Sequence, residues 1–494
     1  MILEVNENPS LDSCPIRKLM LWISVESAQR RVREHVMRIR KNMDWRGVRR
    51  GFGSVLVGAF VVSLTPGLAM GQSGEVTFTK DIAPILQRSC QSCHRPGPGG
   101  GAPMSLLTYN DVRPWARAIK ARTSERTMPP WFIDRNVGVQ EFKADPSLSD
   151  EEIAMIGAWV DSGAPRGNPA DLPPLRQFPD GKEWTIGTPD LVVSSPEEVI
   201  QAVAADWHGY WESSPTGMTE DRFVKAVEVH EVRVSGSRVK SEGLGGYSVI
   251  HHAGIVAGTP GEGIATGPVN PTQGGFGMTH EAGQNATQYV DGLGVKLPAD
   301  SFLHWRVHTH PFGEEVVARL DVGFKFHPEG YEPKYSAPGP GIFLTFNDLD
   351  IPGGEKNLRF DAMAVTRNPS KLVTFEPHMH AGGIRMCLNA QYPNGIRETL
   401  TCAGYDHNWV KVYNYADHAA PLIPAGTIVH AIAWYDNSVG NRNIIEPRNW
   451  HGLGSRSMDD MFFFLGRFVG LTDEQYEEEL AVRQLGGTPT AQND

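Results

Sequence analysis

Two histidines separated by one residue, His378 and His380, are the side chains best suited to chemistry in this chain. They lie in the segment 375–386, and residues two apart on an extended strand project to the same face. Two imidazoles on one face can bind a single transition-metal ion; an isolated pair can instead be two polar side chains on a sheet surface. Fifteen of the 17 histidines fall between His208 and His451. This concentration predicts a metal-binding protein in the second half of the chain.

Adjacent histidines, His251 and His252, lie upstream of this pair. Neighbours on a regular strand point to opposite faces, so both can reach one metal only at a strand end or a β-bulge. The glycine that follows, Gly254, makes such a departure plausible. Either histidine alone would more often be structural.

The segment 305–313 supplies a third imidazole from His308, with His310 and His304 as further candidates. The choice between His308 and His310 stays open at this point. Met461 lies in an apolar segment downstream and offers a soft thioether, although a core position is its default interpretation.

A different chemistry is indicated near the N-terminus, where Cys90, Cys93 and His94 form a Cys-x-x-Cys-His motif. This is the attachment signature of c-type haem: two thiols take the vinyl groups and the histidine becomes the proximal iron ligand. A redox dithiol or half a zinc site are the alternatives, but no second cysteine pair lies nearby. We expect a helix over 78–88 and a second one after the capping box that begins at Ser149.

The sixth iron ligand should be a methionine or a histidine. We favour Met128, because the Pro-rich loop 127–131 can hold a thioether rigidly. Met104 lies only ten residues after His94, a short path around the haem edge. Either methionine could instead fill the core. Methionine ligation raises the iron potential and suits electron transfer.

Residues 49–71 read as an export signal, with a basic start, a short apolar run and a small-x-small ending at Gly71. We expect the true start at or near Met43, a signal over about 43–71, and an over-long 1–42; a cytoplasmic extension with a membrane anchor is the alternative. Cys14 would then lie outside the mature chain. Removing 1–71, which carries 11 basic and 6 acidic side chains, takes the net charge from −11 to −16. That charge argues against nucleic acid or an anionic membrane as partner.

The length of 494 residues predicts about three domains, and 53 glycines with 36 prolines indicate many turns and β structure. The expected fold class is multidomain: a small all-α domain followed by two all-β sandwich domains. Strands are expected over 222–229, 302–307 and 316–326. The expected divisions are 1–71, the haem domain 76–165, a linker 166–190, the two sandwiches 191–347 and 348–470, and an acidic tail 471–494 with a short helix.

A hairpin is predicted at Asn394-Gly395, the dipeptide preferred in type I′ turns. This turn would put Cys387 directly opposite Cys402. An exported protein can oxidise such a pair to a disulfide. The residue count puts the two cysteines at a hydrogen-bonded position of the strand pair, which is the less favourable geometry for a cross-strand disulfide.

Two resemblances follow from these motifs. Residues 76–165 resemble the class I cytochrome c fold, in the subgroup with a Met-Pro-Pro-Trp loop. Residues 205–466 resemble the copper type II, ascorbate-dependent monooxygenases, the family of peptidylglycine α-hydroxylating and dopamine β-monooxygenases. The second resemblance rests on several ordered motifs: His251-His252, His308 with Pro311 and Gly313, Pro377 to His380 with Arg385-Met386, Tyr405 to Trp409, Tyr435 to Ser438, and Ser457 to Met461.

The resemblance implies two copper ions and jelly-roll-like sandwiches. His251, His252 and His308 would hold the ion that stores an electron, and His378, His380 and Met461 the ion where oxygen is activated. The implied reaction hydroxylates a C–H bond with O₂, delivers the second oxygen atom to water and uses two electrons. The family's animal enzymes have no haem domain, so the covalent haem c held by Cys90, Cys93, His94 and Met128 would raise the local concentration of electron donor.

The leading hypothesis is therefore a periplasmic or secreted copper monooxygenase with no membrane span after signal cleavage. It would take electrons from ascorbate or a redox protein and act on a small molecule or peptide that the sequence does not identify. A non-catalytic electron-transfer or copper-handling protein is the second hypothesis. An oxidase that reduces dioxygen or peroxide is the third.

Overall fold

The computed structural model describes residues 75–96, 102, 104–178, 184–204, 207–235, 249–258, 276–281, 286–309, 311, 313–335, 344–454, 456 and 458–484. The predicted signal, the residues before it with Cys14, and His310 lie outside this part of the chain. Within it, no helix combines the length and the apolarity needed to cross a bilayer.

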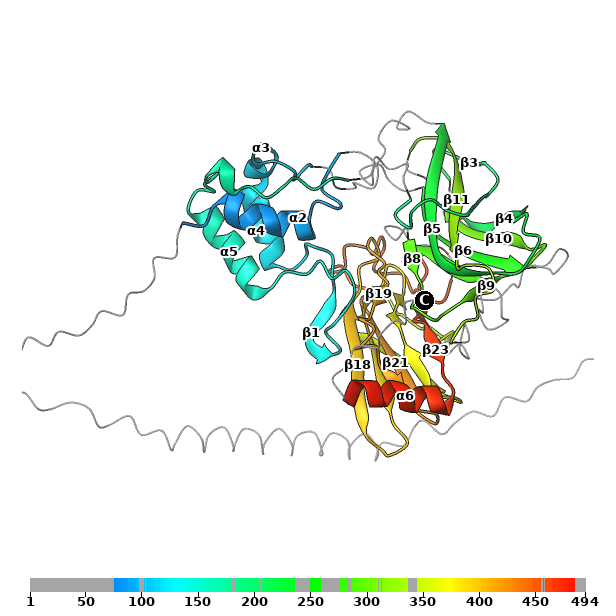
Figure 1. Ribbon diagram of the computed structural model, residues 1–494. Helices are drawn as coiled ribbons and strands as arrows, with labels where there is room; N and C mark the ends of the chain where they lie inside the picture. The colour runs from blue at the N-terminus through cyan, green and yellow to red at the C-terminus, as the bar shows by residue number, and fades with distance from the viewer. Residues whose placement is uncertain are drawn as a thin grey trace, which may run out of the picture. The chain divides into compact units, whose positions relative to one another are not determined.

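The first part of the described chain is helical (Figure 1). A short π-helical turn leads directly into α2, as predicted for 78–88, and Ser149 and Glu152 form the predicted capping box of α5. Trp159 on α5 is fully buried and packs with Phe78. The elements are η1 (Phe78–Ile82), α2 (Ala83–Ser89), α3 (Tyr109–Val112), η2 (Arg113–Trp115), α4 (Ala116–Ser124), α5 (Asp150–Asp161) and η3 (Pro169–Asp171).

One strand of this part leaves the helices and joins a sheet that belongs to the end of the chain. β1 (Ile133–Gly138) pairs antiparallel with β18 (Arg397–Gly404). Trp131 and Phe142, which flank β1, are partly buried and pack against the core of that part. The expected haem domain 76–165 is therefore not self-contained, because its sequence includes an edge strand of the C-terminal sheet.

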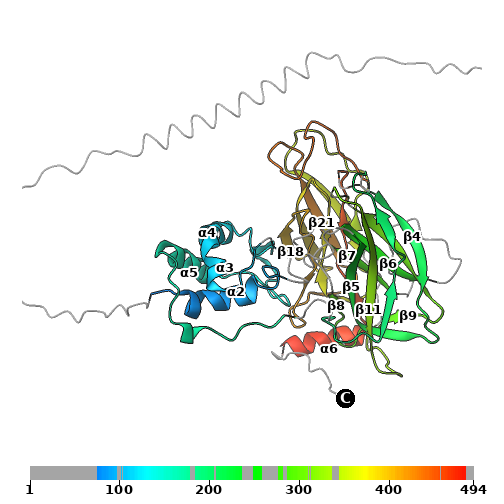
Figure 2. The ribbon, with the colours of Figure 1, turned by 90° about the horizontal axis from the view of Figure 1, so that it is seen from above.

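The middle of the chain forms two facing antiparallel sheets, one with the order β4-β10-β6-β7 and the other with β2-β11-β5-β8. Their strands alternate core and outward residues: Leu303, Trp305 and Val307 of β10 are fully buried in the shared core. Figures 1 and 2 show β5 beside β11. The strands predicted over 222–229, 302–307 and 316–326 are confirmed as β5, β10 and β11. The strands are β2 (Leu191–Ser194), β3 (Glu198–Ile200), β4 (Trp207–Pro215), β5 (Arg222–Ser235), β6 (Ile250–Gly258), β7 (Gly277–Glu281), β8 (Ala286–Gln288), β9 (Val295–Leu297), β10 (Phe302–Thr309) and β11 (Val316–Phe326).

The last part of the chain packs the sheet β1-β18-β17-β21-β13 against three small sheets over a second core. The overall architecture is therefore mostly β, with several sheets, as expected. The strands are β12 (Leu344–Thr345), β13 (Leu358–Val365), β14 (Ser370–Leu372), β15 (Thr374–Phe375), β16 (Pro377–His378), β17 (Gly383–Gln391), β18, β19 (Tyr413–Asn414), β20 (Leu422–Ile423), β21 (Ile428–Tyr435), β22 (Phe463–Phe464) and β23 (Phe468–Gly470).

The acidic tail contains the expected helix, α6 (Asp473–Gln484) (Figure 2). One of its acidic residues is buried: Glu479 accepts hydrogen bonds from Lys371 Nζ at 3.0 Å and from the Tyr335 hydroxyl at 2.7 Å. Since a buried carboxylate is costly unless it is paired and hydrogen-bonded, these two contacts allow α6 to dock on residues from both β parts.

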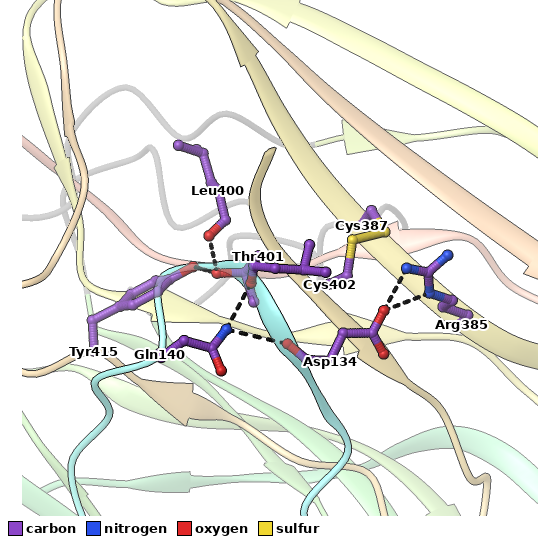
Figure 3. Close-up of a disulfide and its surroundings, with 9 residues drawn as sticks. Asp134, Gln140, Arg385, Cys387, Leu400, Thr401, Cys402 and Tyr415 are labelled. Atoms are coloured by element: carbon purple, nitrogen blue, oxygen red, sulfur yellow. Dashed lines mark hydrogen bonds and ion pairs between the residues drawn. A yellow bond between two sulfur atoms is a disulfide. The ribbon is translucent and has the colours of Figure 1, made fainter. Parts of the chain in front are cut away.

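Cys387 and Cys402 form the predicted disulfide (Figure 3). Two features of the predicted hairpin are wrong, the type of turn and the regular register, and their effects on the position of the cysteines offset each other. The turn is a three-residue loop: Tyr392 N donates to Ile396 O, and Gly395 alone of the turn pair has a positive φ, so it is not type I′. The register then shifts between Leu388 and Asn389, which brings the cysteines opposite each other. Their Cα atoms are 4.0 Å apart, closer to the spacing of a non-hydrogen-bonded pair than to that of the predicted hydrogen-bonded one.

Replacing both bridge residues by alanine (Cys387→Ala with Cys402→Ala) should lower the free energy of unfolding by about 2–4 kcal/mol, because the cross-link restricts the unfolded chain. Urea denaturation measures this change. The unaltered protein in excess reductant is the matched comparison. A midpoint that reductant leaves unchanged would contradict the contribution of the bridge.

Gly138, at the end of β1, tests how this strand is attached. Its φ is +63°, and a Cβ there would lie 2.1 Å from the Leu400 carbonyl oxygen. Gly163 also has a positive φ but no atom within 4 Å, so Gly163→Ala carries only the backbone strain of about 1–2 kcal/mol. Gly138→Ala should lose more stability and unprotect the β1 amides in hydrogen exchange. Equal losses in the two variants would refute the close packing of β1 on β18.

Candidate metal centre

The first group of histidines stands on the outer face of the sheet β4-β10-β6-β7. Because Leu303, Trp305 and Val307 point into the core, the alternation of β10 directs His308 to the opposite face. His308 is paired in register with His252 of β6. The His308 Nδ1 and the His252 Nε2 are 3.0 Å apart.

A β-bulge brings the adjacent histidine to the same place. The register passes from His308 opposite His252 to Thr309 opposite Ile250, so His251 is the extra residue of β6. Its ring centroid lies 5.4 Å from that of His252 and 5.3 Å from that of His308. The predicted departure from regular strand geometry is confirmed, although it falls at His251 itself.

The second group comes from the C-terminal part. His378 ends β16, and the chain then turns, with Gly383 N donating to the His380 carbonyl at 3.0 Å. Met379 between the histidines is fully buried in the core. The two imidazoles therefore share the side opposite to Met379, with ring centroids 5.6 Å apart, as period-two alternation predicts.

Backbone carbonyls set the orientation of the His380 ring. The carbonyl oxygens of Arg456 and Asp459 lie 3.0 and 3.2 Å from its Nδ1. A proton on Nδ1 donated to these oxygens leaves the lone pair on Nε2, which is buried and makes no hydrogen bond with any described residue. A hydrogen bond to one ring nitrogen commonly fixes the tautomer of a metal-binding histidine in this way.

The segment that carries Met461 runs beside the same two histidines. Phe463 is paired in register with His378, and Asp460 accepts a hydrogen bond from Gly382 N at 3.1 Å. Met461 lies between these two attachment points with its side chain buried, and its carbonyl accepts from the Tyr435 hydroxyl at 2.6 Å. Met461 as the third ligand beside His378 and His380 stays a prediction.

The histidines of both parts meet in one cluster. Two groups of three have ligand atoms within 4.8 Å of one another: His251, His252 and His308, and His252, His378 and His380. His252 belongs to both groups, with its ring 5.3 Å from that of His378. The sequence predicts two separate trios, whereas this arrangement joins them through one imidazole.

Burial keeps two members of this cluster, His252 and His380, uncharged. The pKa of His252 and the pKa of His380 are well below the usual value, first because burial disfavours the charged ring and then because of neighbouring imidazoles, His378 before the others. Both rings are therefore neutral at pH 7, which is the form that binds metals. The donors fit a transition ion: among the described residues both groups contain imidazole alone, whereas Mg²⁺ and Ca²⁺ require oxygen ligands.

Two other histidines differ from expectation. His304 lies outside both groups, and its Nδ1 is 2.7 Å from the Ser213 hydroxyl, so it is not a ligand here. His407 was noted only as part of a motif, yet its ring is 4.7 Å from that of His251 and 5.6 Å from that of His380. Its position on the loop after β18 gave no periodicity from which this proximity could be deduced.

The Cys-x-x-Cys-His motif forms one tight turn after α2. His94 N donates to Cys90 O at 2.9 Å, and Cys93 N donates to the same oxygen at 3.2 Å. Both cysteines are free thiols, and burial raises the pKa of Cys90 to about 12. Two thiols on one turn beside an imidazole are the groups that covalent haem attachment needs.

The two candidate methionines occupy different places. The Met104 carbonyl is 3.4 Å from the His94 Nδ1, so the backbone of Met104 lies on the Nδ1 side of the imidazole. Met128 lines a cavity of about 980 Å³ together with Ile133 and Gly404. The residues lining this cavity do not include the Cys-x-x-Cys-His motif, and Met128 as iron ligand stays a prediction.

The loop that carries His407 continues toward the haem motif. Lys411 is half-buried, and burial lowers its pKa while its interaction with the nearby Cys93 opposes that shift. Only three residues of chain, 408–410, lie between His407 and Lys411.

No known protein family matches the sequence, and no curated protein matches it. Among solved structures, the cowpea mosaic virus top component aligns at 10% identity with a TM-score of 0.28, over 58% of this chain and 91% of its own. Broad bean stain virus aligns at 10% identity with a TM-score of 0.29, over 62% of this chain and 93% of its own. The N-terminal tandem CBM22 domain of Paenibacillus barcinonensis Xyn10C aligns at 11% identity with a TM-score of 0.17, over 57% of this chain and 91% of its own. Such low scores carry no argument about function.

The shared position of His252 makes the two groups dependent on each other, because one nitrogen lone pair binds one cation. Titration with Zn²⁺, a redox-silent probe, should show a second ion binding more weakly than the first. His252→Gln should weaken both steps by about 10-fold or more, whereas His251→Gln should weaken mainly one. Calorimetry measures both affinities. Two equal, independent sites that survive His252→Gln would contradict the shared arrangement.

Proposed function

We propose that this chain is an exported copper-dependent monooxygenase that hydroxylates a C–H bond of an organic compound with O₂. The observation that carries the proposal is the buried cluster in which two β parts contribute two groups of three imidazoles that share His252. Such donors suit copper in both of its common oxidation states.

His251, His252 and His308 would hold one copper ion, and His378, His380 and Met461 the other. When bound, copper supplies one-electron redox chemistry and activation of O₂. The overall reaction balances as substrate C–H, O₂, two electrons and two protons giving the alcohol and one water. The Met461 thioether, a soft donor, would favour the reduced state of an ion held there.

The residues around the cluster support this chemistry by orientation and by exclusion of water. His308 and His380 are fully buried, so these side chains would keep bulk water away from an ion held there. The carbonyls of Arg456 and Asp459 hold the His380 ring with Nε2 toward the cluster. Asp460, buried and 3.3 Å from His451, secures the turn that follows His380.

Electrons would arrive through a covalent haem c held by Cys90, Cys93 and His94, with Met128 as the sixth ligand. The helical part would accordingly be a cytochrome c domain of class I, and the β parts jelly-roll-like sandwiches. Ascorbate or a redox protein would be the external donor, and the signal-like segment 49–71 would direct the chain to the periplasm or outside the cell.

A second candidate is a copper-handling or electron-transfer protein that catalyses no oxygenation. The full burial of His308 and His380 favours it, because a substrate must reach the cluster for hydroxylation. Isotope incorporation separates the two candidates.

Oxygen insertion is the direct test. The copper- and haem-loaded protein, supplied with reductant, ¹⁸O₂ and a panel of C–H compounds, should yield a product that carries one ¹⁸O atom, detected by mass spectrometry. Met461→Ala should lower this yield by about 10–100-fold or more, while haem reduction stays intact.

The matched control is Met458→Ala, since Met458 lies three residues away and is exposed. It should keep the yield of the unaltered protein. Full activity in Met461→Ala would overturn the assignment of Met461. Copper binding without any ¹⁸O product across the panel would favour the second candidate.

A further inference from the structure

The loop between β18 and β19 is tied to the histidine pair of the C-terminal part. Tyr405 N donates to the Ile384 carbonyl at 2.9 Å. The Tyr405 hydroxyl donates to the carbonyl of Met379, the residue between His378 and His380. The start of the loop is therefore fixed to the backbone that positions that pair.

The residues on both sides of His407 are also held in place. Asp406 Oδ1 accepts from the backbone N and the Nδ2 of Asn408, each at 3.0 Å, and Trp409 N donates to the Asp406 carbonyl at 2.8 Å. Arg442 pairs with Asp406 at 3.1 Å. These contacts fix the backbone on both sides of His407 and leave its side-chain torsions free to turn the ring.

The His407 ring lies against the first group. The His407 ring centroid is 4.7 Å from that of His251, whereas the other two members of the group are 5.4 and 5.3 Å from it. The groups with ligand atoms within 4.8 Å do not include His407, so ligation requires its ring to rotate about the side-chain torsions. A phenylalanine would fill the same space but could not bind a metal. An imidazole at this place adds one more ligand nitrogen to the cluster.

We propose that His407 is a fourth imidazole ligand of the metal held by His251, His252 and His308, and that it closes this centre to small external ligands. The inference rests on the proposed function and deepens it. A site with three protein ligands keeps an open position, whereas four protein ligands close it. A closed centre suits electron storage, and O₂ is then left to the centre of His378 and His380.

The experiment compares the unaltered full chain with His407→Gln, His407→Phe and His418→Gln, each loaded with two equivalents of Cu²⁺. His407→Phe keeps a ring of similar size, and His418 is an exposed histidine paired with Glu141. Azide titration followed by the copper charge-transfer absorption counts open positions. Competition with a copper chelator gives the affinities, and electron paramagnetic resonance of the first equivalent reports the coordinating nitrogens.

The unaltered protein and His418→Gln should bind one azide per two copper ions, with a nitrogen pattern of four imidazoles in the stronger-binding centre. Both His407 variants should bind two azides and lose copper affinity by about 10-fold or more at one centre. Unchanged azide stoichiometry and affinity in both variants would overturn the role of His407 and leave the proposed function standing. An unaltered protein that binds no copper would overturn both.

Discussion

Imidazoles from two separate β parts lie together in a space from which water is largely excluded. The rest of the structure holds the strands and loops that carry them in place. Taking a polar nitrogen out of water costs about 1–3 kcal/mol unless it finds a partner. His380 illustrates the cost: its Nδ1 faces two carbonyls, while its buried Nε2 has no hydrogen-bond partner in the described part of the chain. A bound cation is the partner that such an atom lacks. The low pKa of His252 and of His380 keeps both rings in the form that accepts it.

Local irregularities, rather than regular strands, position the donors. The bulge at His251 turns a residue that would face the core toward His252 and His308. The turn closed by Gly383 N lets His380 follow His378 onto the same side. The supporting elements come from distant segments, since β1 extends the C-terminal sheet and α6 docks through Glu479 onto Lys371 and Tyr335. Through β1, the part that carries the Cys-x-x-Cys-His motif and the C-terminal sheet thus belong to one continuous framework.

Much of this could be predicted from the sequence where the signal is local. The capping box at Ser149, the strands around His308 and the proximity of His378 to His380 follow from short-range rules. The sharing of His252 and the approach of His407 could not be predicted, because both depend on how two β parts pack. The disulfide shows a third case: Cys387 and Cys402 pair as predicted, but through a three-residue turn and a register shift that offset each other.

The central claim is that these imidazoles bind copper as two linked centres. A crystal of the copper-loaded protein, measured at the copper absorption edge, tests it directly through the anomalous difference map. The account predicts two peaks, one among His251, His252 and His308 and the other beside His378 and His380. A map with copper elsewhere on the protein, and no peak among these five histidines, would contradict it.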